Sequence, residues 1–130
     1  MAKILIADDE PDILEVMAKK ITGAGYEVVT AADGQIAWEK IVLEKPDAVL
    51  LDLKMPGLHG FEVLEKLRKK PPFKKWCPVI IVSAHEEFTN MQKGFALEAE
   101  HYLTKPCSIE EVLKALELVL SLSEQRRGEE

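Results

Sequence analysis

The stretch VLLDLKMPGLHGFEVL, residues 49–64, passes from an apolar run through a turn into a helical pattern. Residues 48–51 are continuously apolar, as is typical of a parallel strand covered on both faces. Phe61, Leu64 and Leu67 then recur at helical spacing, until Pro71-Pro72 ends the pattern. Asp52 stands directly after the apolar run. The stretch therefore predicts a strand followed by a helix, with a carboxylate at the carboxyl end of the strand.

The same alternation of strand and helix runs through the whole chain. Further β-rich runs occupy residues 3–7, 26–31, 78–83 and 101–104, and the mixed run 26–31 fits a strand near an edge of the sheet. Such alternation predicts right-handed crossovers and a parallel sheet with helices on both faces. We therefore expect an α/β fold, a doubly wound (βα)₅ arrangement around a five-stranded parallel sheet.

The predicted helices have recognisable beginnings. Pro11 suits the first turn of a helix, Asp33 can cap the second, and Ser108 with Glu111 forms a capping box for the last. Gly23 and Gly25 supply a stop for the first helix. The expected apolar positions are Ile13, Leu14, Met17 and Ile21 in the first helix, Ile36, Ala37, Ile41 and Val42 in the second, Phe88, Met91 and Phe95 in a weaker fourth, and Ile109, Val112, Leu113, Leu116 and Leu120 in the last.

Length and composition fit one ordinary globular domain. The chain has 130 residues, of which 47% are hydrophobic and 31% charged, and a net charge of −6. The acidic balance disfavours nucleic acid and anionic membranes as direct partners. Cys77 and Cys107 form no CxxC pair, so we expect reduced thiols. No signal peptide or membrane span is evident, and a cytoplasmic domain over residues 1–122 with a frayed polar tail over 123–130 is predicted.

Polar side chains follow four of the five predicted strands. Asp8, Asp9 and Glu10 follow the first, Asp52 the third, Ser83 the fourth, and Lys105 with Pro106 the fifth. In open parallel sheets, ligands bind beyond the carboxyl ends of the strands, where the strand order reverses. If strands one, three, four and five are neighbours, these side chains converge on one pocket.

The chemistry of this set points to phosphoryl transfer. Carboxylates suit Mg²⁺, a lysine suits a phosphoryl group, and a carboxylate can attack phosphorus to give an aspartyl phosphate. Each residue also has a structural alternative when taken alone. The three acids after the first strand could begin a helix, Asp52 and Ser83 could be turn or cap residues, and Lys105 could be a surface lysine. The histidines His59, His85 and His101 show no metal-ligand spacing.

The motifs resemble a known family. ILIADDEPDI (4–13), VLLDLKMPGLHGFEVL, PVIIVSA (78–84) and YLTKP (102–106) are similar to the receiver domain of bacterial two-component response regulators. The resemblance implies a flavodoxin-like fold with strand order 2-1-3-4-5. It also implies a phosphorylation-dependent signalling switch, which catalyses its own phosphorylation and slow dephosphorylation and is not otherwise an enzyme.

The resemblance assigns roles by position. Asp52 is the expected phosphoacceptor, and Asp8, Asp9, Asp52 and the backbone carbonyl of Lys54 are the expected ligands of Mg²⁺, or alternatively Mn²⁺. Lys105 and Ser83 would contact the phosphoryl group.

Further roles concern the response to phosphorylation. Ser83 and Tyr102 are the expected switch pair, and a cis Lys105-Pro106 peptide would aim the lysine into the pocket. Lys54 and His85 are expected to modulate the phosphoryl lifetime.

The resemblance also implies partners. A sensor histidine kinase or a histidine phosphotransfer protein would supply the phosphoryl group. An output protein would bind the face of the fourth helix, fifth strand and fifth helix, and the chain would be a monomer or a weak phosphorylation-dependent dimer, without nucleic acid or membrane partners. The chain ends soon after the fifth helix, which predicts a stand-alone receiver. The alternative is that the chain is a fragment of a longer regulator.

The sequence departs from the family pattern in places, and other functions are also considered. Glu98 and Glu100-His101 replace the glycine-containing turn found in many family members, which predicts an altered exit from the fourth helix. The basic loop 69–78 is either a solvated loop or a docking patch. A phosphatase with an aspartate nucleophile would carry the motif D-x-D, in which the second aspartate is the general acid/base. Asp52-Leu53-Lys54 has a lysine at that position. A phosphorylation-independent interaction module is the remaining alternative.

Overall fold

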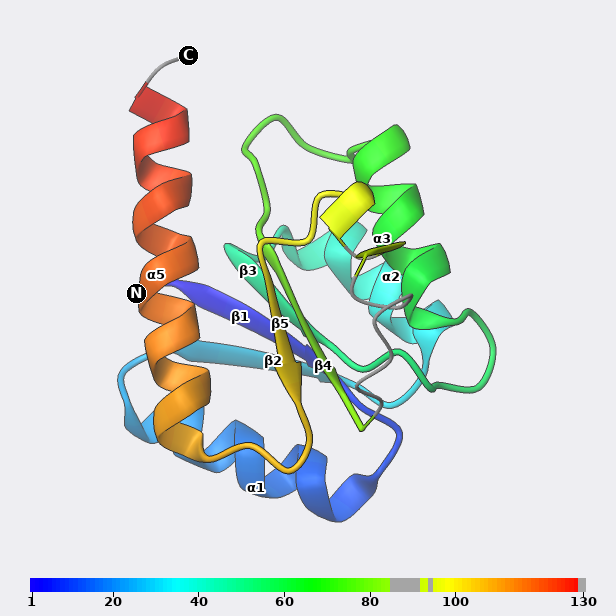
Figure 1. Cartoon of the computed structure of the whole chain (residues 1–130), viewed down its shortest axis with the longest axis vertical. Coiled ribbons are helices and arrows are strands. Elements are labelled where there is room, and N and C mark those ends of the chain that lie inside the picture. The colour runs from blue at the N-terminus through cyan, green and yellow to red at the C-terminus, as the bar shows by residue number, and fades with distance from the viewer. Residues whose placement is uncertain (85–91, 94, 129–130) are drawn as a thin grey trace.

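The computed structural model describes residues 1–84, 92–93 and 95–128, with side chains as far as residue 124, and shows a sheet between two layers of helices (Figure 1). The strands are β1 (Lys3–Ala7), β2 (Glu27–Ala31), β3 (Ala48–Leu51), β4 (Val79–Ser83) and β5 (His101–Thr104). The helices are α1 (Pro11–Gly23), α2 (Gly34–Glu44), α3 (Gly60–Lys69) and α5 (Ile109–Gly128). Among the described residues, no helix has the length and apolar character needed to cross a membrane.

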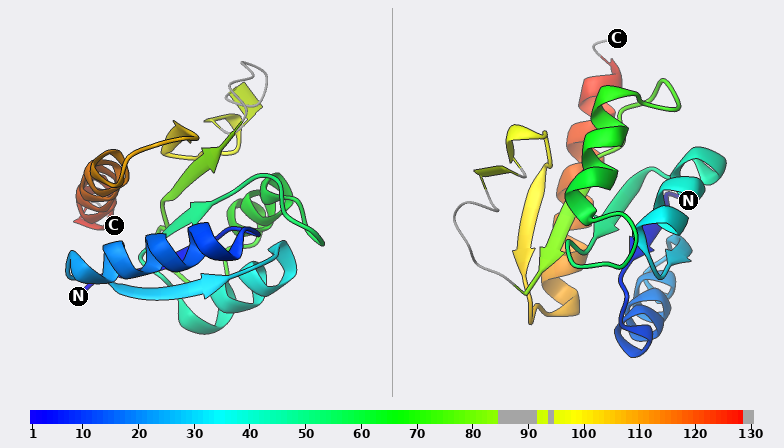
Figure 2. Two further views of the ribbon diagram at one scale, coloured as in Figure 1. Left: turned by 90° about the horizontal axis from the view of Figure 1, so that it is seen from below. Right: turned by 90° about the vertical axis from the view of Figure 1, so that its right-hand side faces the viewer.

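The sheet is parallel throughout, with strand order β2-β1-β3-β4-β5. This confirms the predicted flavodoxin-like (βα)₅ arrangement and the edge position of residues 26–31. Helices α1 and α5 cover one face, and α2 and α3 cover the other (Figures 1 and 2). Alternate side chains of the central strands point to opposite faces, so two apolar layers form, one under each pair of helices. The strand order brings β1, β3, β4 and β5 side by side.

The predicted helix starts are confirmed. Pro11 is the first residue of α1, and the Asp33 carboxylate accepts a hydrogen bond of 2.8 Å from the backbone N–H of Ile36. The N–H of Glu111 donates to the hydroxyl of Ser108 at 3.1 Å, while the Glu111 carboxylate accepts from the N–H of Ser108 at 3.3 Å. These contacts satisfy backbone donors that have no partner within the helix.

The predicted apolar sides of the helices are only partly correct. In α2, Ala37 and Ile41 are buried, but Ile36 and Val42 are 38% and 43% exposed, so only part of the predicted apolar set faces the core. The reason is that α2 packs against β2, the edge strand, and β1. Only a narrow row of its side chains is therefore covered by the sheet. In α1, Ile21 is buried, whereas Leu14 and Met17 are only half-buried. Of the fourth predicted helix, Phe88 and Met91 lie outside the described residues, and Phe95 is exposed.

The segment predicted to be a frayed tail is helical as far as the structure describes it, to Gly128. Within α5, the buried Ser123 donates its hydroxyl to the carbonyl of Trp76 at 3.2 Å. This contact lies between α5 and the connection that precedes β4.

Glu98 adopts the left-handed conformation, with φ of +61°, that a glycine would adopt more easily. Its carbonyl accepts hydrogen bonds of 3.1 and 3.0 Å from the guanidinium of Arg68. That guanidinium also contacts the Cys77 carbonyl at 2.8 Å and the Glu100 carboxylate at 3.0 Å. The departure from a glycine-containing turn is therefore accommodated by an arginine of α3.

The loop 69–78 is anchored to the same group of residues. Trp76 lies against the guanidinium of Arg68, 3.9 Å from the ring centroid, and its indole N–H donates to the Glu100 carboxylate. Phe73 packs against the apolar layer beneath α2 and α3.

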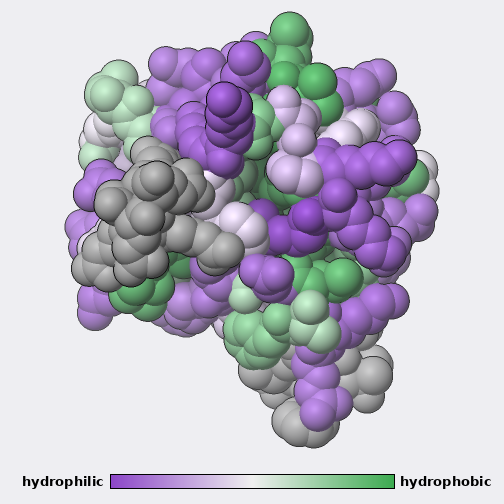
Figure 3. All heavy atoms as spheres, turned by 90° about the horizontal axis from the view of Figure 1, so that it is seen from above, coloured by the Kyte–Doolittle hydropathy of each residue, from purple (hydrophilic) through white to green (hydrophobic). Residues whose placement is uncertain are grey.

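The face of the molecule shown in Figure 3 is mainly hydrophilic, with smaller hydrophobic patches among the charged side chains.

Candidate functional site

The carboxyl ends of β1, β3, β4 and β5 form one edge of the sheet, and their hydrogen-bonded ladder continues into the loops. The N–H of Asp8 donates to the carbonyl of Ala31, and the N–H of Asp52 donates to the carbonyl of Ala7 at 3.0 Å. The N–H of Lys105 donates to the carbonyl of Ser83 at 2.7 Å. The backbone therefore fixes where each of these side chains leaves the sheet.

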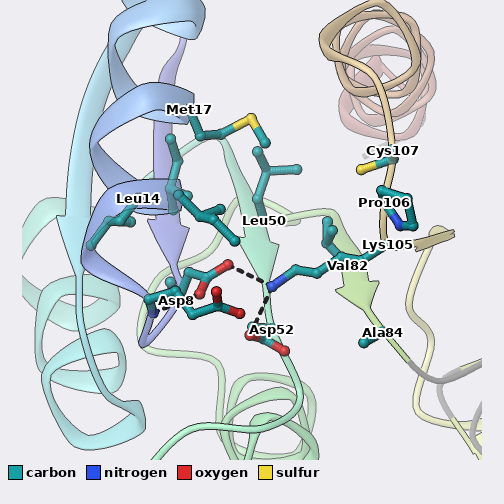
Figure 4. Close-up of a pocket in the computed structure, with 14 residues that line it drawn as sticks. Asp8, Leu14, Met17, Leu50, Asp52, Val82, Ala84, Lys105, Pro106 and Cys107 are labelled. Carbon is teal, nitrogen blue, oxygen red and sulfur yellow. Dashed lines mark hydrogen bonds and ion pairs between the residues drawn. The ribbon is translucent and has the colours of Figure 1, made fainter.

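Lys105 joins two buried carboxylates from different strands. Its Nζ lies 2.8 Å from Oδ2 of Asp8 and 3.1 Å from Oδ2 of Asp52 (Figure 4). Asp8 and Asp52 are 6% exposed as whole residues. Removing one partner of such a buried group leaves an uncompensated charge, which is far more costly than losing a surface ion pair.

The protonation equilibria follow from this arrangement. Burial raises the pKa of Asp52 above its usual range, and the nearby Asp8 charge adds to this, while Lys105 opposes it. Burial lowers the pKa of Lys105, but hydrogen bonding to Asp8 and the charge of Asp52 outweigh it, so the net pKa is raised. Lys105 therefore stays protonated at neutral pH and keeps its positive charge beside both acids.

The remaining carboxylate oxygens are held by backbone donors. Oδ1 of Asp8 accepts from the N–H of Glu10 at 2.9 Å, and Oδ1 of Asp52 accepts from the N–H of Lys54 at 3.2 Å. These contacts orient each carboxylate across the edge of the sheet. Only the backbone of Lys54 takes part in these contacts, and its side chain is exposed at the surface.

Three acids offer oxygen ligands for a cation. One carboxylate oxygen each from Asp8, Asp9 and Glu10 lies within 4.8 Å of the other two, with Asp8 buried and the others exposed. Oxygen-only donors of this kind fit a hard divalent cation such as Mg²⁺. The ammonium group of Lys105 contacts both Asp8 of this cluster and Asp52, and Asp9, Glu10 and Asp52 line one cavity, so the residues present fit a magnesium site beside Asp52.

A polar cavity of about 180 Å³ brings most of the predicted site together. It is lined by Asp9, Glu10, Asp52, Lys54, Ser83, Ala84 and Lys105. Ser83 ends β4 and is 1% exposed. Glu10, which is not among the expected ligands of Mg²⁺, belongs both to the acidic cluster and to the wall of this cavity.

The other predicted residues have defined places or fall outside the description. Tyr102 is buried on β5, beside Ile81 of β4. The Lys105-Pro106 peptide bond is cis. His85 lies outside the described residues. The contact of the Lys54 carbonyl with a metal, and the movements of Ser83 and Tyr102, remain predictions.

Gly60 is a site residue that sequence reasoning did not single out. A Cβ atom at this position would lie 2.5 Å from the carbonyl oxygen of Asp52 and 2.8 Å from Cα of Leu53. The N–H of Gly60 also donates to the carbonyl of Leu53 at 3.0 Å. A glycine at the first position of α3 therefore lets the helix lie directly against the backbone that carries Asp52.

Comparison with known proteins gives a consistent result. Residues 4–117 match the model of the response regulator receiver domain. The chain is 38% identical to the alkaline phosphatase synthesis transcriptional regulatory protein PhoP of Bacillus subtilis, over 94% of this chain and 50% of that protein. It is 39% identical to the phosphate regulon transcriptional regulatory protein PhoB of Pseudomonas aeruginosa, over 90% and 51% respectively. The chain thus spans about half the length of these curated relatives.

Solved structures show the same similarity. A CheY-like receiver domain protein from Methanospirillum hungatei superimposes with a TM-score of 0.90 at 29% identity, covering 97% of this chain and 98% of that one. Chemotaxis protein CheY4 of Vibrio cholerae gives a TM-score of 0.84 at 34% identity, covering 92% and 98%. In both comparisons the similarity extends over nearly the whole of each chain.

Proposed function

The chain belongs to the response regulator receiver domain family, and we propose that it is a signalling switch that accepts a phosphoryl group on Asp52. The observation that carries this proposal is the position of Asp52. It is buried in the wall of the polar cavity, with the ammonium group of Lys105 at 3.1 Å. A carboxylate so placed can act as a nucleophile while a fixed positive charge stabilises the transferring group.

The transfer starts from a phosphohistidine of a sensor kinase or phosphotransfer protein. A carboxylate oxygen of Asp52 attacks phosphorus, the new P–O bond forms, and the P–N bond to the imidazole breaks. The electron pair of that bond goes to the imidazole nitrogen. Asp8, Asp9, Asp52 and the Lys54 carbonyl are the proposed ligands of Mg²⁺, and the grouping of carboxylate oxygens from Asp8, Asp9 and Glu10 supports this proposal. When bound, the ion supplies neutralisation of phosphoryl charge.

Phosphorylation changes the charge at the edge of the sheet. The new group adds strong acceptor oxygens and negative charge, which attract Lys105 and the hydroxyl of Ser83. Lys105 then exchanges its contact with the Asp52 carboxylate for one with the phosphoryl group. Movement of Ser83 frees space toward Tyr102, and the altered positions bias the face around β5 and α5 that an output protein recognises.

Lys54 is the proposed determinant of phosphoryl lifetime. Its side chain is exposed and lines the polar cavity beside Asp52. It extends over the phosphoryl group and obstructs the line along which water would attack. His85 is assigned the same kind of role on the resemblance to receiver domains alone. Lys54→Ala should shorten the half-life of the phosphorylated protein, and an unchanged half-life would remove this role.

The proposal is tested by incubation with acetyl phosphate and Mg²⁺, followed by intact-mass measurement. We expect one added phosphoryl group, stable in acid and released by base or hydroxylamine, which Asp52→Asn abolishes. Asp33→Asn is a matched control because asparagine also caps a helix, and it should be phosphorylated normally. A folded protein that gains no adduct would favour a phosphorylation-independent interaction module. Rapid turnover of phosphomonoesters would favour a hydrolase.

A further inference from the structure

A larger cavity adjoins the polar cavity and shares Glu10, Asp52 and Lys105 with it. Its volume is about 450 Å³, and it opens between α1 and the connection from β5 to α5 (Figure 4). Its floor is formed by Ile6, Leu50 and Val82, from three neighbouring strands. Its walls are Leu14 and Met17 on one side and Pro106 with Cys107 on the other.

The cavity has the volume of a small-molecule site. Such sites typically occupy about 300–1,000 Å³. Leu14 and Met17 are only half-buried, because the apolar side of α1 faces this space as well as the sheet. Cys107, a small side chain, stands opposite Met17 and does not fill the gap. The space is therefore a preformed apolar recess.

The recess ends in charged groups at the edge of the sheet. Asp8, Glu10 and Asp52 line it together with Lys105. Three carboxylates against one ammonium group leave this end with an excess of negative charge. The ammonium group of Lys105 is also already held by Asp8 and Asp52. A ligand that enters the recess is therefore favoured if it carries a positive charge at the end that meets Asp8 and Glu10.

We propose that this recess binds a small aromatic amine. The flat apolar body lies on Leu50 and Val82, between Met17 and Cys107. The ammonium group is directed to the carboxylates of Asp8 and Glu10. An apolar pocket with a few convergent polar groups is the usual form of a small-molecule site, where the apolar walls provide affinity and the polar groups fix orientation.

The amine and a divalent cation would share ligands. Asp8 and Glu10 belong both to the recess and to the acidic cluster that fits Mg²⁺. Binding of one cation therefore weakens binding of the other, and the effect is reciprocal. This competition rests on the proposed function, whereas binding of the amine alone does not.

Binding is measured with tryptamine in the absence of Mg²⁺ and phosphodonor, on protein with ¹³C-labelled methionine methyl groups. The Met17 methyl signal should shift and saturate, while that of Met55, which lies in the layer beneath α2 and α3, should not. Indole-3-propionate has the same ring with an anionic group, and it should bind at least about tenfold more weakly. An unmoved Met17 signal, or equal binding of the anion, would overturn the proposal.

A variant that fills the recess provides the second arm. Cys107→Phe places a ring in the space, and it should weaken tryptamine binding by at least roughly tenfold. Val82→Phe places a ring at the floor of the recess, and it replaces Cys107→Phe in the test if that variant fails to fold. Leu43→Phe adds the same kind of ring on exposed α2 and should bind tryptamine as the parent does. Unchanged binding in a folded filling variant would contradict the site. Since no phosphodonor is present, this result is independent of whether Asp52 is phosphorylated.

Discussion

The Nζ of Lys105 lies 3.1 Å from Oδ2 of Asp52, across 53 positions of the chain, and the same ammonium group contacts Asp8 at 2.8 Å. One cation thus holds two buried carboxylates together at the edge of the sheet. Asp9 and Glu10 add negative charge nearby, at the exposed side of the cluster. Repulsion should therefore dominate at the exposed Asp9 and attraction to Lys105 at the buried Asp8, and single substitutions can separate the two effects.

Asp9→Asn should raise the melting temperature in the presence of a chelator. The substitution removes an exposed charge that repels Asp8 and Glu10, and the gain should be up to about 1 kcal/mol, or roughly 2–5 °C. Magnesium binding should weaken in the same variant. Thermal denaturation with and without Mg²⁺ measures both effects. Glu39→Gln, an exposed change on α2, is the control and should alter neither.

Asp8→Asn should act in the opposite direction on stability. Asp8 is buried and accepts from Lys105, so its neutralisation removes one of the two carboxylates that compensate a partly buried ammonium group. We expect a loss of about 1–3 kcal/mol in chelator. If Asp8→Asn instead stabilises the protein as much as Asp9→Asn, repulsion dominates at both positions and the role assigned to Lys105 is wrong.

Gly60→Ala should destabilise the protein and impair phosphorylation. The added Cβ would meet the carbonyl of Asp52 and Cα of Leu53, both backbone atoms that have little room to move. Overpacking of this kind costs typically about 1–3 kcal/mol. Gly23→Ala is the matched control, since a Cβ there has no atom within 4 Å. Urea denaturation and the rate of acetyl phosphate labelling should separate the two variants, and equal behaviour would contradict the close approach at Gly60.

Glu98→Gly should stabilise the protein. Position 98 has φ of +61°, which glycine adopts without the steric cost that a Cβ brings, and the carbonyl contacts with Arg68 do not require a side chain at this position. The expected gain is about 0.5–1 kcal/mol in urea denaturation. Glu98→Ala keeps the steric cost and should show no such gain. A stabilisation by alanine equal to that by glycine would point to the charge of Glu98 instead of its backbone.

The two thiols should react very differently. Burial raises the pKa of Cys77 to about 12, and the residue is 2% exposed. Burial also raises the pKa of Cys107, but this residue is partly exposed and lines the apolar recess. A raised pKa lowers the thiolate fraction, so both react slowly at pH 8, and only Cys107 is accessible. Labelling with a disulfide reagent should modify one thiol in the native protein and two after denaturation. In the native Cys107→Ser variant no thiol should be modified. Labelling of Cys77 in this variant would contradict its burial.

The sequence was sufficient to predict the parts of the fold that depend on chain order. The alternation of apolar runs and helical patterns predicts parallel strands, and parallel strands place Asp8, Asp52 and Lys105 at one edge. The strand order came from the resemblance to receiver domains, because pattern alone leaves several arrangements open. The cap formed by Asp33 was predictable because it involves neighbours in the chain.

Features that depend on distant contacts were not predictable. Arg68 compensates for the missing glycine at position 98, but the two residues are 30 positions apart, and nothing in the local pattern relates them. The exposure of Ile36 depends on how α2 lies over the edge of the sheet. The recess beside Cys107 depends on the volume left between α1 and the connection from β5 to α5, which a list of apolar positions does not specify.

The central claim is that Asp52 is the residue that carries the phosphoryl group, and the most direct test is to locate that group. Borohydride reduces an aspartyl phosphate to homoserine, and tandem mass spectrometry of the digested protein then identifies the converted residue. After incubation with acetyl phosphate and Mg²⁺, homoserine should be found at position 52 and be absent from Asp52→Asn. Conversion at Asp8 or Asp9, or no conversion at position 52 in protein that has gained a phosphoryl group, would contradict the account.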